Sequence, residues 1–407
     1  MTEPIERPAP AGPSRWRWLV WFGLLLLLLP PVVYQDNVFR LSLFAKFLAL
    51  AVLALGVDLI WGYTGMLSLG QGLYFAVGAY SVALSLKLKQ AAADAGGDAV
   101  PGTVPPDYMN YTNLPVTHPD YHPPAALAWI APLADIRVAL LVAVLLPTLL
   151  AFLFGMVTFR LRIRGVYFAL ITQALLYAVY TLVEDQQRYT GGVVGVKNLA
   201  DMKLFGVTFN PYKHVLKLYW LVAGTLAVCL FGCWLLVNSR FGKVLTAIRD
   251  NENRVLALGY NTALYRTTAF AIAGGLAGLG GALFAVANEL AGQEYLSITF
   301  SIEMVVLVAV GGRGTLFGAV LGAVLVSEAR TRISEAAPEW WPIVLGCLFI
   351  GSVLLLPDGI VGGLTRLGRK LFRRRPTAAA AAVAGPSANG HVPTDGTPSF
   401  PQTVRGA

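Results

Sequence analysis

The chain has 407 residues, of which 56% are hydrophobic and only 13% are charged, and its formal net charge is +9. A soluble core cannot bury this much apolar sequence, whereas membrane spans of about 20 residues can. The apolar runs are continuous rather than alternating, which excludes an outer-membrane barrel. The basic residues lie mainly at segment ends and in the C-terminal tail, as in the positive-inside pattern, so the charge does not indicate nucleic-acid binding.

The composition predicts an all-α fold, a polytopic transmembrane helical bundle of about eight spans plus a re-entrant or broken helix pair. Residues 1–15 are polar and Pro-rich, and we expect them to be disordered. The transmembrane domain is expected at 16–365, and a basic stretch followed by a disordered tail at 366–407. The expected spans are 16–34, 39–61, 73–86, 137–159, 165–183, 218–237, 267–290 and 340–356.

Two glycine-rich interruptions lie in opposite halves of the chain. The first is GYTGMLSLGQG at 62–72, and the second is GGRGT at 311–315, inside an apolar stretch at 301–328 whose halves are each too short for a straight span. Paired breaks of this kind indicate a midplane pathway between structural repeats.

The loop at 238–266 is the longest charged segment with a helical pattern. A helical wheel places one group on an apolar side, Val244, Ile248, Val255 and Leu258, and another on a polar side, Lys243, Arg249, Asp250, Glu252 and Asn253. Such a helix docks into a protein groove or rests on lipid headgroups, and the acids on its polar side favour a protein groove.

The basic segments set the expected topology. RLRIR at 160–164, the loop at 238–266 and the basic run at 366–375 all fall in the cytoplasm, with both termini, only if 301–328 starts and ends outside. Residues 87–136 and 184–217 are then external. The histidines in these loops lack the spacing of metal ligands, so we expect no metal site.

Several motifs resemble a known family. They are GYTGMLSLGQGLYFAVGAY, RIRGVYFALITQALLYA, FGKVLTAIRDNENRVLALGYN and AFAIAGGLAGLGGALF. In this order they resemble the ABC-transporter permeases for branched-chain amino acids and urea, over roughly residues 58–363.

The resemblance implies an importer subunit of the bacterial inner membrane that is not itself an enzyme. It implies four kinds of partner besides the lipid bilayer: a second homologous permease, two ATPase subunits and an extracytoplasmic substrate-binding protein. No GxxxxGK[ST] loop occurs in the sequence, so ATP and Mg would be bound by the ATPase subunits, and we expect no cofactor in this chain. The resemblance also implies that the 238–266 loop couples to an ATPase, through Lys243, Arg249, Asp250, Asn251, Glu252, Ala257 and Gly259.

Within the family, ITQALLYA and the closing run EAAPEWWPIVLGCLFIGSVLLLPDGIVG resemble the urea and short-chain amide branch. A neutral amide solute suits a path lined by a side chain such as Gln173, which donates and accepts hydrogen bonds without a charge. Branched-chain amino acids remain the alternative substrate. A self-sufficient channel for urea-like solutes is the alternative of another class.

Candidate pathway residues are the polar groups at membrane depth and one tyrosine: Ser68, Gln71, Thr172, Gln173 and Tyr177. The alternative is that they hold helices together, since polar and small residues often do so in membranes. Glu303 and Arg313 bracket a short apolar run, and we expect them to pair or to lie at the outer interface. Asp58 is expected at a helix end or at the interface.

Overall fold

The computed structural model describes residues 30–34, 37–96, 99–109, 129–163, 165–204, 206–354 and 359–363. These residues belong to one of the two compact units of the chain, Met1–Leu364. The other unit, Thr365–Ala407, lies outside the described residues, as do the polar start at 1–15 and most of the first expected span.

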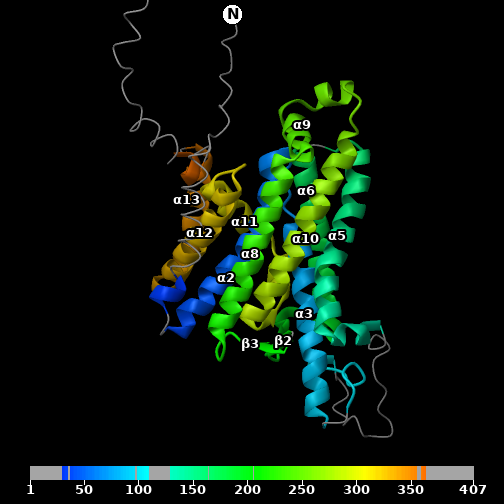
Figure 1. Ribbon diagram of the computed structural model, residues 1–407, viewed down its shortest axis with the longest axis vertical. Helices are drawn as coiled ribbons and strands as arrows, with labels where there is room; N and C mark the ends of the chain where they lie inside the picture. The colour runs from blue at the N-terminus through cyan, green and yellow to red at the C-terminus, as the bar shows by residue number, and fades with distance from the viewer. Residues whose placement is uncertain are drawn as a thin grey trace, which may run out of the picture. The chain divides into compact units, whose positions relative to one another are not determined.

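Long helices make up most of the described chain (Figure 1). They are α2 (Val38–Asp58), α3 (Gln71–Asp94), α5 (Ile136–Arg160), α6 (Val166–Asp185), α8 (Val215–Asn238), α9 (Arg240–Ala257), α10 (Thr262–Asn288), α11 (Ile298–Gly311), α12 (Leu316–Ala336) and α13 (Trp341–Leu354).

Short elements occupy the connections. They are the π-helical turn η1 (Leu59–Thr64), the helix α7 (Gln187–Thr190), the 3₁₀ turns η2 (Asp107–Met109), η3 (Ala131–Ala134), η4 (Gly192–Val194), η5 (Gln293–Leu296) and η6 (Pro338–Trp340), and the strands β1 (Val196–Lys197), β2 (Met202–Leu204), β3 (Val207–Phe209) and β4 (Leu290–Ala291). β1 pairs antiparallel with β4, and β2 with β3.

Five of the described helical segments are long and apolar enough to cross a membrane, and the pair α11 and α12 makes up to six, with a bend of 118° at its break. An all-α transmembrane bundle with a re-entrant or broken helix pair is therefore confirmed. The buried 24-residue helix α3 and the 14 described residues of α13 occupy two further expected spans.

α2 and α10 form the centre of the bundle. In the most apolar 18-residue stretch of each helix, 83% of the residues are buried in α2 and 78% in α10. The same share is only 22–28% in α5, α6 and α8. Small residues allow this close packing. A side chain at Gly78 of α3 would collide with the backbone of Gly278 in α10, and one at Gly56 of α2 with Ala273. The outer helices α5, α6 and α8 consequently expose long faces.

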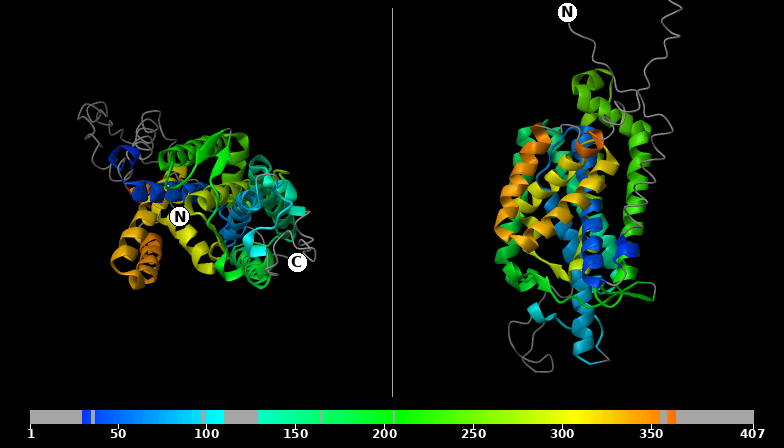
Figure 2. Two further views of the ribbon diagram at one scale, coloured as in Figure 1. Left: turned by 90° about the horizontal axis from the view of Figure 1, so that it is seen from below. Right: turned by 90° about the vertical axis from the view of Figure 1, so that its left-hand side faces the viewer.

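The helix α9 and the strands β2 and β3 lie at opposite ends of the bundle (Figures 1 and 2). An ion pair of 3.0 Å joins Arg40 at the start of α2 to Glu335 at the end of α12. The turn η1 that follows the other end of α2 contacts α9, so α12 ends at the end of the bundle opposite α9. α11 begins at that same end, just after β4 and η5. The bent pair thus starts and ends on one side, as the expected topology requires.

Glu303 of α11 pairs with Arg330 of α12 rather than with Arg313. The Arg330 Nη1 donates to both carboxylate oxygens of Glu303, at 2.7 and 2.8 Å, and the Glu303 side chain is only 3% exposed. The expected pairing with Arg313 is wrong because the bend brings the second half of α12 back alongside α11, while Arg313 stays in the break.

We predict that Arg330→Ala destabilises the protein by up to about 3 kcal/mol, because it leaves a buried carboxylate without its counter-charge. The thermal unfolding midpoint in detergent measures this. Arg332→Ala removes the Arg332–Glu328 pair on the same helix, in which the arginine is more exposed, and should shift the unfolding midpoint much less. Equal shifts of the two variants would contradict the prediction.

Candidate functional site

The first break follows α2. The helix widens into the π-helical turn η1, where the Thr64 hydroxyl donates to the Ile60 carbonyl, and it ends at Gly65 with φ of 75°. Residues 65–70 are not helical, and α3 begins at Gln71. A left-handed backbone at Gly65 suits glycine because it has no Cβ. The sequence thus ends one helix at membrane depth and starts another six residues later.

The second break joins α11 to α12. Gly312 and Gly314 have φ of 130° and 76°, and the Thr315 hydroxyl donates to the Gly312 carbonyl at 2.7 Å. Backbone of this kind is tolerated at membrane depth only where protein or water satisfies it.

The two breaks contact each other. The backbone N–H of Gly314 donates to the Asp58 carboxylate at 2.6 Å. A Cβ at Gly62 would lie only 2.5 Å from the Gly314 nitrogen, so the close approach requires glycine. The Arg313 guanidinium lies 5.2 Å from the centre of the Trp61 ring, as in a cation–π contact. Asp58 is the last residue of α2, so the expected helix-end position is confirmed, and it is fully buried under the neighbouring break rather than at the interface.

The helix α9 reaches the first break through Arg249. The Arg249 Nη1 donates to the Gly62 carbonyl at 2.6 Å, and its Nε lies 3.3 Å from the exposed Asp250 carboxylate. A hydrogen-bonded route therefore runs from α9 through the first break to the second. We call it the Arg249–Gly62–Asp58–Gly314 linkage.

A second contact ties α9 to α10. The Glu252 carboxylate pairs with Arg266 at 2.9 Å and accepts a hydrogen bond from the Thr262 hydroxyl at 3.0 Å. The wheel places Glu252 on the polar side, and this is wrong because Asn251 is not helical, with φ of −158°. This kink turns Glu252 towards α10. The Asn251 carboxamide then accepts from the backbone N–H of Arg254 at 3.1 Å and caps the second half.

The remaining predicted coupling residues lie on the outside of α9. Ile248 and Val255 are buried as expected, whereas Leu258 is 71% exposed because the helix ends at Ala257. The exposed members of the predicted set are Lys243, Arg249, Asp250, Asn251, Ala257 and Gly259. Arg249 and Glu252 also bond inwards, to Gly62 and to Arg266, whereas the other exposed residues form an open face.

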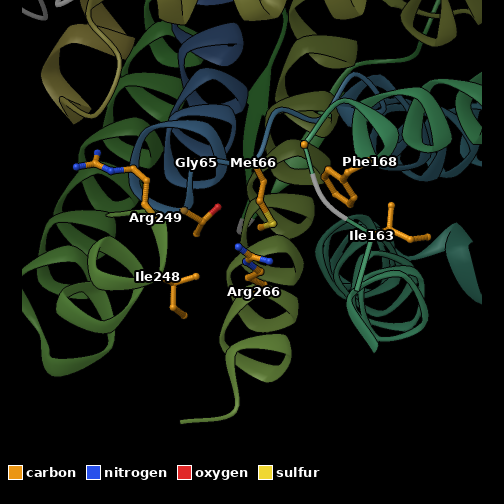
Figure 3. A pocket seen from close by; sticks show the side chains of 9 residues that line it. Gly65, Met66, Ile163, Phe168, Ile248, Arg249 and Arg266 are labelled. Carbon is orange, nitrogen blue, oxygen red and sulfur yellow. The ribbon is translucent and has the colours of Figure 1, made fainter. Parts of the chain in front are cut away.

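An open pocket of about 110 Å³ lies beside the linkage (Figure 3). α9 borders it with Ile248 and Arg249. On the other side lie Ile163, in the loop before α6, and Phe168, in the first turn of α6. Thr64, Gly65, Met66, Gly165 and Arg266 complete its lining. The short loop between α5 and α6 therefore lies at the same end of the bundle as α9.

The five predicted pathway residues do not converge on one cavity. Ser68, Gln71 and Thr172 are buried where the first break packs on α6. There the Thr172 hydroxyl accepts from the backbone N–H of Leu69 at 3.2 Å and donates to the Ala169 carbonyl at 2.8 Å. The carboxamide of Gln71 has no hydrogen-bond partner in the described part of the chain. Gln173 is half-buried and Tyr177 is exposed, and both lie on the flank of α6 next to this buried side.

Sequence reasoning missed the partners of the predicted residues. Arg266 and Arg330 carry no local signal, because each pairs with an acid on another helix. Gly62 and Gly314 stand out as glycines, but nothing in the sequence shows that they touch.

We predict that Gly62→Ala lowers the thermal unfolding midpoint, because its methyl group would push the second break away from Asp58 and break the bond to Gly314. Gly224→Ala in α8 is the matched control, since a Cβ there meets no other atom within 4 Å. Replacing a helical glycine at an open position should instead raise stability by about 0.5–1 kcal/mol. An unfolding midpoint that rises in both variants would show that the breaks are not in contact.

Comparisons with known proteins place the chain in a family. The family described as "Branched-chain amino acid transport system / permease component" matches residues 39–353. The chain is 24% identical over 330 residues to the high-affinity branched-chain amino acid transport system permease protein LivM of Escherichia coli (strain K12), covering 76% of this chain and 67% of that protein. It is 25% identical over the same length to LivM of Salmonella typhimurium.

The autoinducer 2 import system permease protein LsrC of Salmonella paratyphi B is 27% identical over 247 residues, covering 59% of this chain and 68% of that protein. No solved structure matches the chain significantly. The family match spans more than half of the chain and includes both breaks and α9. The chain is therefore a multi-pass membrane protein that belongs to the permease component family of branched-chain amino acid transport systems.

Proposed function

We propose that the chain is a permease subunit of an ATP-driven importer that moves urea or short-chain amides across the bacterial inner membrane. ATP hydrolysis takes place on two separate ATPase subunits, a second permease chain completes the membrane part, and an extracytoplasmic binding protein delivers the solute. The relatives named permease proteins of transport or import systems support this class.

The linkage from α9 to both breaks is the observation that carries the coupling role. Arg249 bonds to Gly62, and Asp58 beside it bonds to Gly314. A displacement of α9 by an ATPase would therefore shift the ends of both broken helices together. Rigid movement of one packed element against another is a common way to alternate between two states.

The open face of α9 is the surface proposed for the ATPase, with Lys243, Asp250, Asn251, Ala257 and Gly259 exposed on it. Both signs of charge occur there, which suits a protein cleft rather than anionic lipid. The basic loop Arg160–Arg162 lies at the same end, which supports a cytoplasmic orientation for this end under the positive-inside rule.

The stretch of α6 before Glu184 carries no charged residue, which favours a neutral amide as the solute. Thr172 and Gln173 lie inside an apolar span, where a carboxylate would need a counter-charge. A zwitterionic amino acid would require charged groups or helix ends along its path. Branched-chain amino acids remain the second candidate because the LivM proteins are named for that transport system.

A channel that works without ATPases is the alternative of another class. It requires no linkage between a surface helix and the two breaks. Uptake by this chain with its permease partner in vesicles without the ATPases would favour the channel.

We predict that Arg249→Ala keeps ATP hydrolysis by the assembled transporter but lowers ATP-driven uptake about tenfold or more, because a charge-assisted hydrogen bond worth about 1.5–3 kcal/mol is lost. Vesicles reconstituted with all subunits, with radiolabelled urea and phosphate release measured in parallel, test this. Lys213→Ala, an exposed cation just before α8 at the opposite end of the bundle, is the control and should leave uptake nearly unchanged. Normal coupled uptake in Arg249→Ala would exclude the linkage as the coupling route.

We predict that Gln173→Glu impairs uptake of urea and acetamide. An ionised carboxylate at membrane depth needs a counter-charge, and the proposed neutral path does not supply one. Competition assays with urea, acetamide and leucine against labelled substrate give the profile. Thr181→Val is the control. It also replaces a side chain by one of nearly the same volume, it lies nearer the end of the same helix, and it should leave the substrate profile unchanged. If the substrate profile stays unchanged in Gln173→Glu, Gln173 does not line the path.

A further inference from the structure

The Asp58 carboxylate, at the place where the two breaks meet, is only partly hydrogen-bonded. Its side chain is fully buried. One oxygen, Oδ1, accepts from the backbone N–H of Gly314 at 2.6 Å, whereas Oδ2 has no hydrogen-bond partner in the described part of the chain. An ionised carboxylate has about four lone-pair sites, and a buried charge without a counter-charge is costly. Asp58 can therefore accept from a further donor.

Two guanidinium groups flank this carboxylate but are held by other groups. Arg249 of α9 donates from Nη1 to the carbonyl of Gly62, four residues after Asp58. Arg313 of the second break lies over the Trp61 ring, with 5.2 Å between its guanidinium carbon and the ring centre. Both arginines are close enough to act electrostatically on the Asp58 carboxylate. The structure thus places two cations beside one buried anion.

The ends of two helices add to the negative charge at this place. The helix formed by α2 and η1 ends at Thr64, and α11 ends at Gly311, three residues before Gly314. The carboxyl end of a helix carries a partial negative charge. The start of α12 contributes the Gly314 N–H but no full positive charge. The junction of the breaks therefore depends on the neighbouring arginines for its charge balance.

The two arginines differ in what holds them. Arg249 belongs to α9, the helix that the ATPases are proposed to move. Arg313 is exposed, and its contact with Trp61 is a cation–π contact, which is weak at an exposed position compared with an ion pair to a buried carboxylate. Trp61 follows Asp58 by three residues in one continuous helix, so the two side chains are neighbours. Rotation of its long side chain is enough to bring the Arg313 guanidinium from the ring to the carboxylate.

In the observed arrangement Arg249 occupies the space beside the junction. Its Nη1 bonds to the Gly62 carbonyl and lies 3.7 Å from the point where a Cβ on Gly314 would be. A second guanidinium at the same place would bring two positive charges together. Withdrawal of Arg249 removes this repulsion and takes a counter-charge away from Asp58.

We infer that Arg313 is a positioning residue that replaces Arg249 beside Asp58 when α9 moves. The inference rests on the proposed import function, in which ATPases displace α9. With α9 in the observed position, Arg249 holds the first break and Arg313 rests on Trp61. With α9 displaced, Arg313 pairs with Oδ2 of Asp58 and keeps the second break attached to the end of α2.

Such an exchange gives the junction two discrete arrangements, which is what coupling between distant sites requires. Without Arg313, displacement of α9 would leave the buried Asp58 charge without a counter-charge, and this cost would oppose the movement. With Arg313, each arrangement has one arginine at the carboxylate. The exchange therefore lowers the cost of moving α9 and keeps the two breaks together in both states.

Three substitutions distinguish this exchange from a simple packing role. Arg313→Gln removes the replacement charge, Arg313→Lys keeps a positive charge, and Trp61→Leu removes only the group on which Arg313 rests. Each is placed in the complete transporter in vesicles, where uptake of radiolabelled urea and phosphate release are measured in parallel. Arg160→Gln is the control for loss of a positive charge, since Arg160 is exposed at the end of α5 on the same side of the bundle.

We predict that Arg313→Gln lowers the uptake per ATP hydrolysed by about fivefold or more, because the displaced state lacks its counter-charge. Arg313→Lys should restore most of this ratio. Trp61→Leu should keep the ratio, since Arg313 can still reach Asp58. Equal losses in Arg313→Gln and Trp61→Leu would show that the stacked contact itself matters, and would overturn the inference. An equal loss in Arg160→Gln would also overturn it.

A second measurement does not depend on the solute. The thermal unfolding midpoint of the purified complex is compared without nucleotide and after trapping with ATP and vanadate. Arg313→Gln should lower the midpoint more in the trapped complex, and this difference should disappear when Asp58→Asn is also present. The same effect of Arg313→Gln in both states would overturn the exchange. A state-dependent effect in a complex that does not carry urea would keep this inference and reject the proposed solute.

Discussion

A helix that stops inside a bilayer leaves backbone groups that no lipid can satisfy, and this constraint organises the bundle. In the described part of the chain, apolar helices are interrupted in this way twice, after α2 and after α11. The two interruptions are brought together, since Gly314 donates to Asp58, and the Gly62 carbonyl accepts from Arg249. The buried carboxylate of Asp58 in particular needs the second break as its partner.

The same constraint explains why the centre of the molecule is made of small residues. Breaks can meet only if the helices that carry them approach closely, and α2 and α10 do so through Gly56, Ala273 and their neighbours. Two packed helices of this kind transmit displacement with little loss, since close-packed interiors deform little. Longer side chains are consequently left for α5, α6 and α8, which surround this centre.

The sequence predicts each of these features locally, but not how they combine. Apolar length predicts the spans, and glycine density predicts both breaks. Contact between the breaks is beyond any local pattern, because Asp58 and Gly314 are 256 residues apart. The kink at Asn251 has no periodic signal either, so a regular wheel puts Glu252 on the wrong side. Likewise the partner of Glu303 depends on the 118° bend, which composition does not give. The candidate pathway residues lie at the first break and on α6, and helix packing decides which of them face inward.

The helix α6 is bonded to the same break that α9 holds. The Thr172 hydroxyl accepts a hydrogen bond from Leu69, which belongs to the first break that receives Arg249. Gln173 follows Thr172 directly in this helix. An α-helix moves as a rigid body over such short distances, so a shift of the first break would displace α6 as well. A movement of α9 therefore reaches α6 through the first break, with no separate route between the two helices.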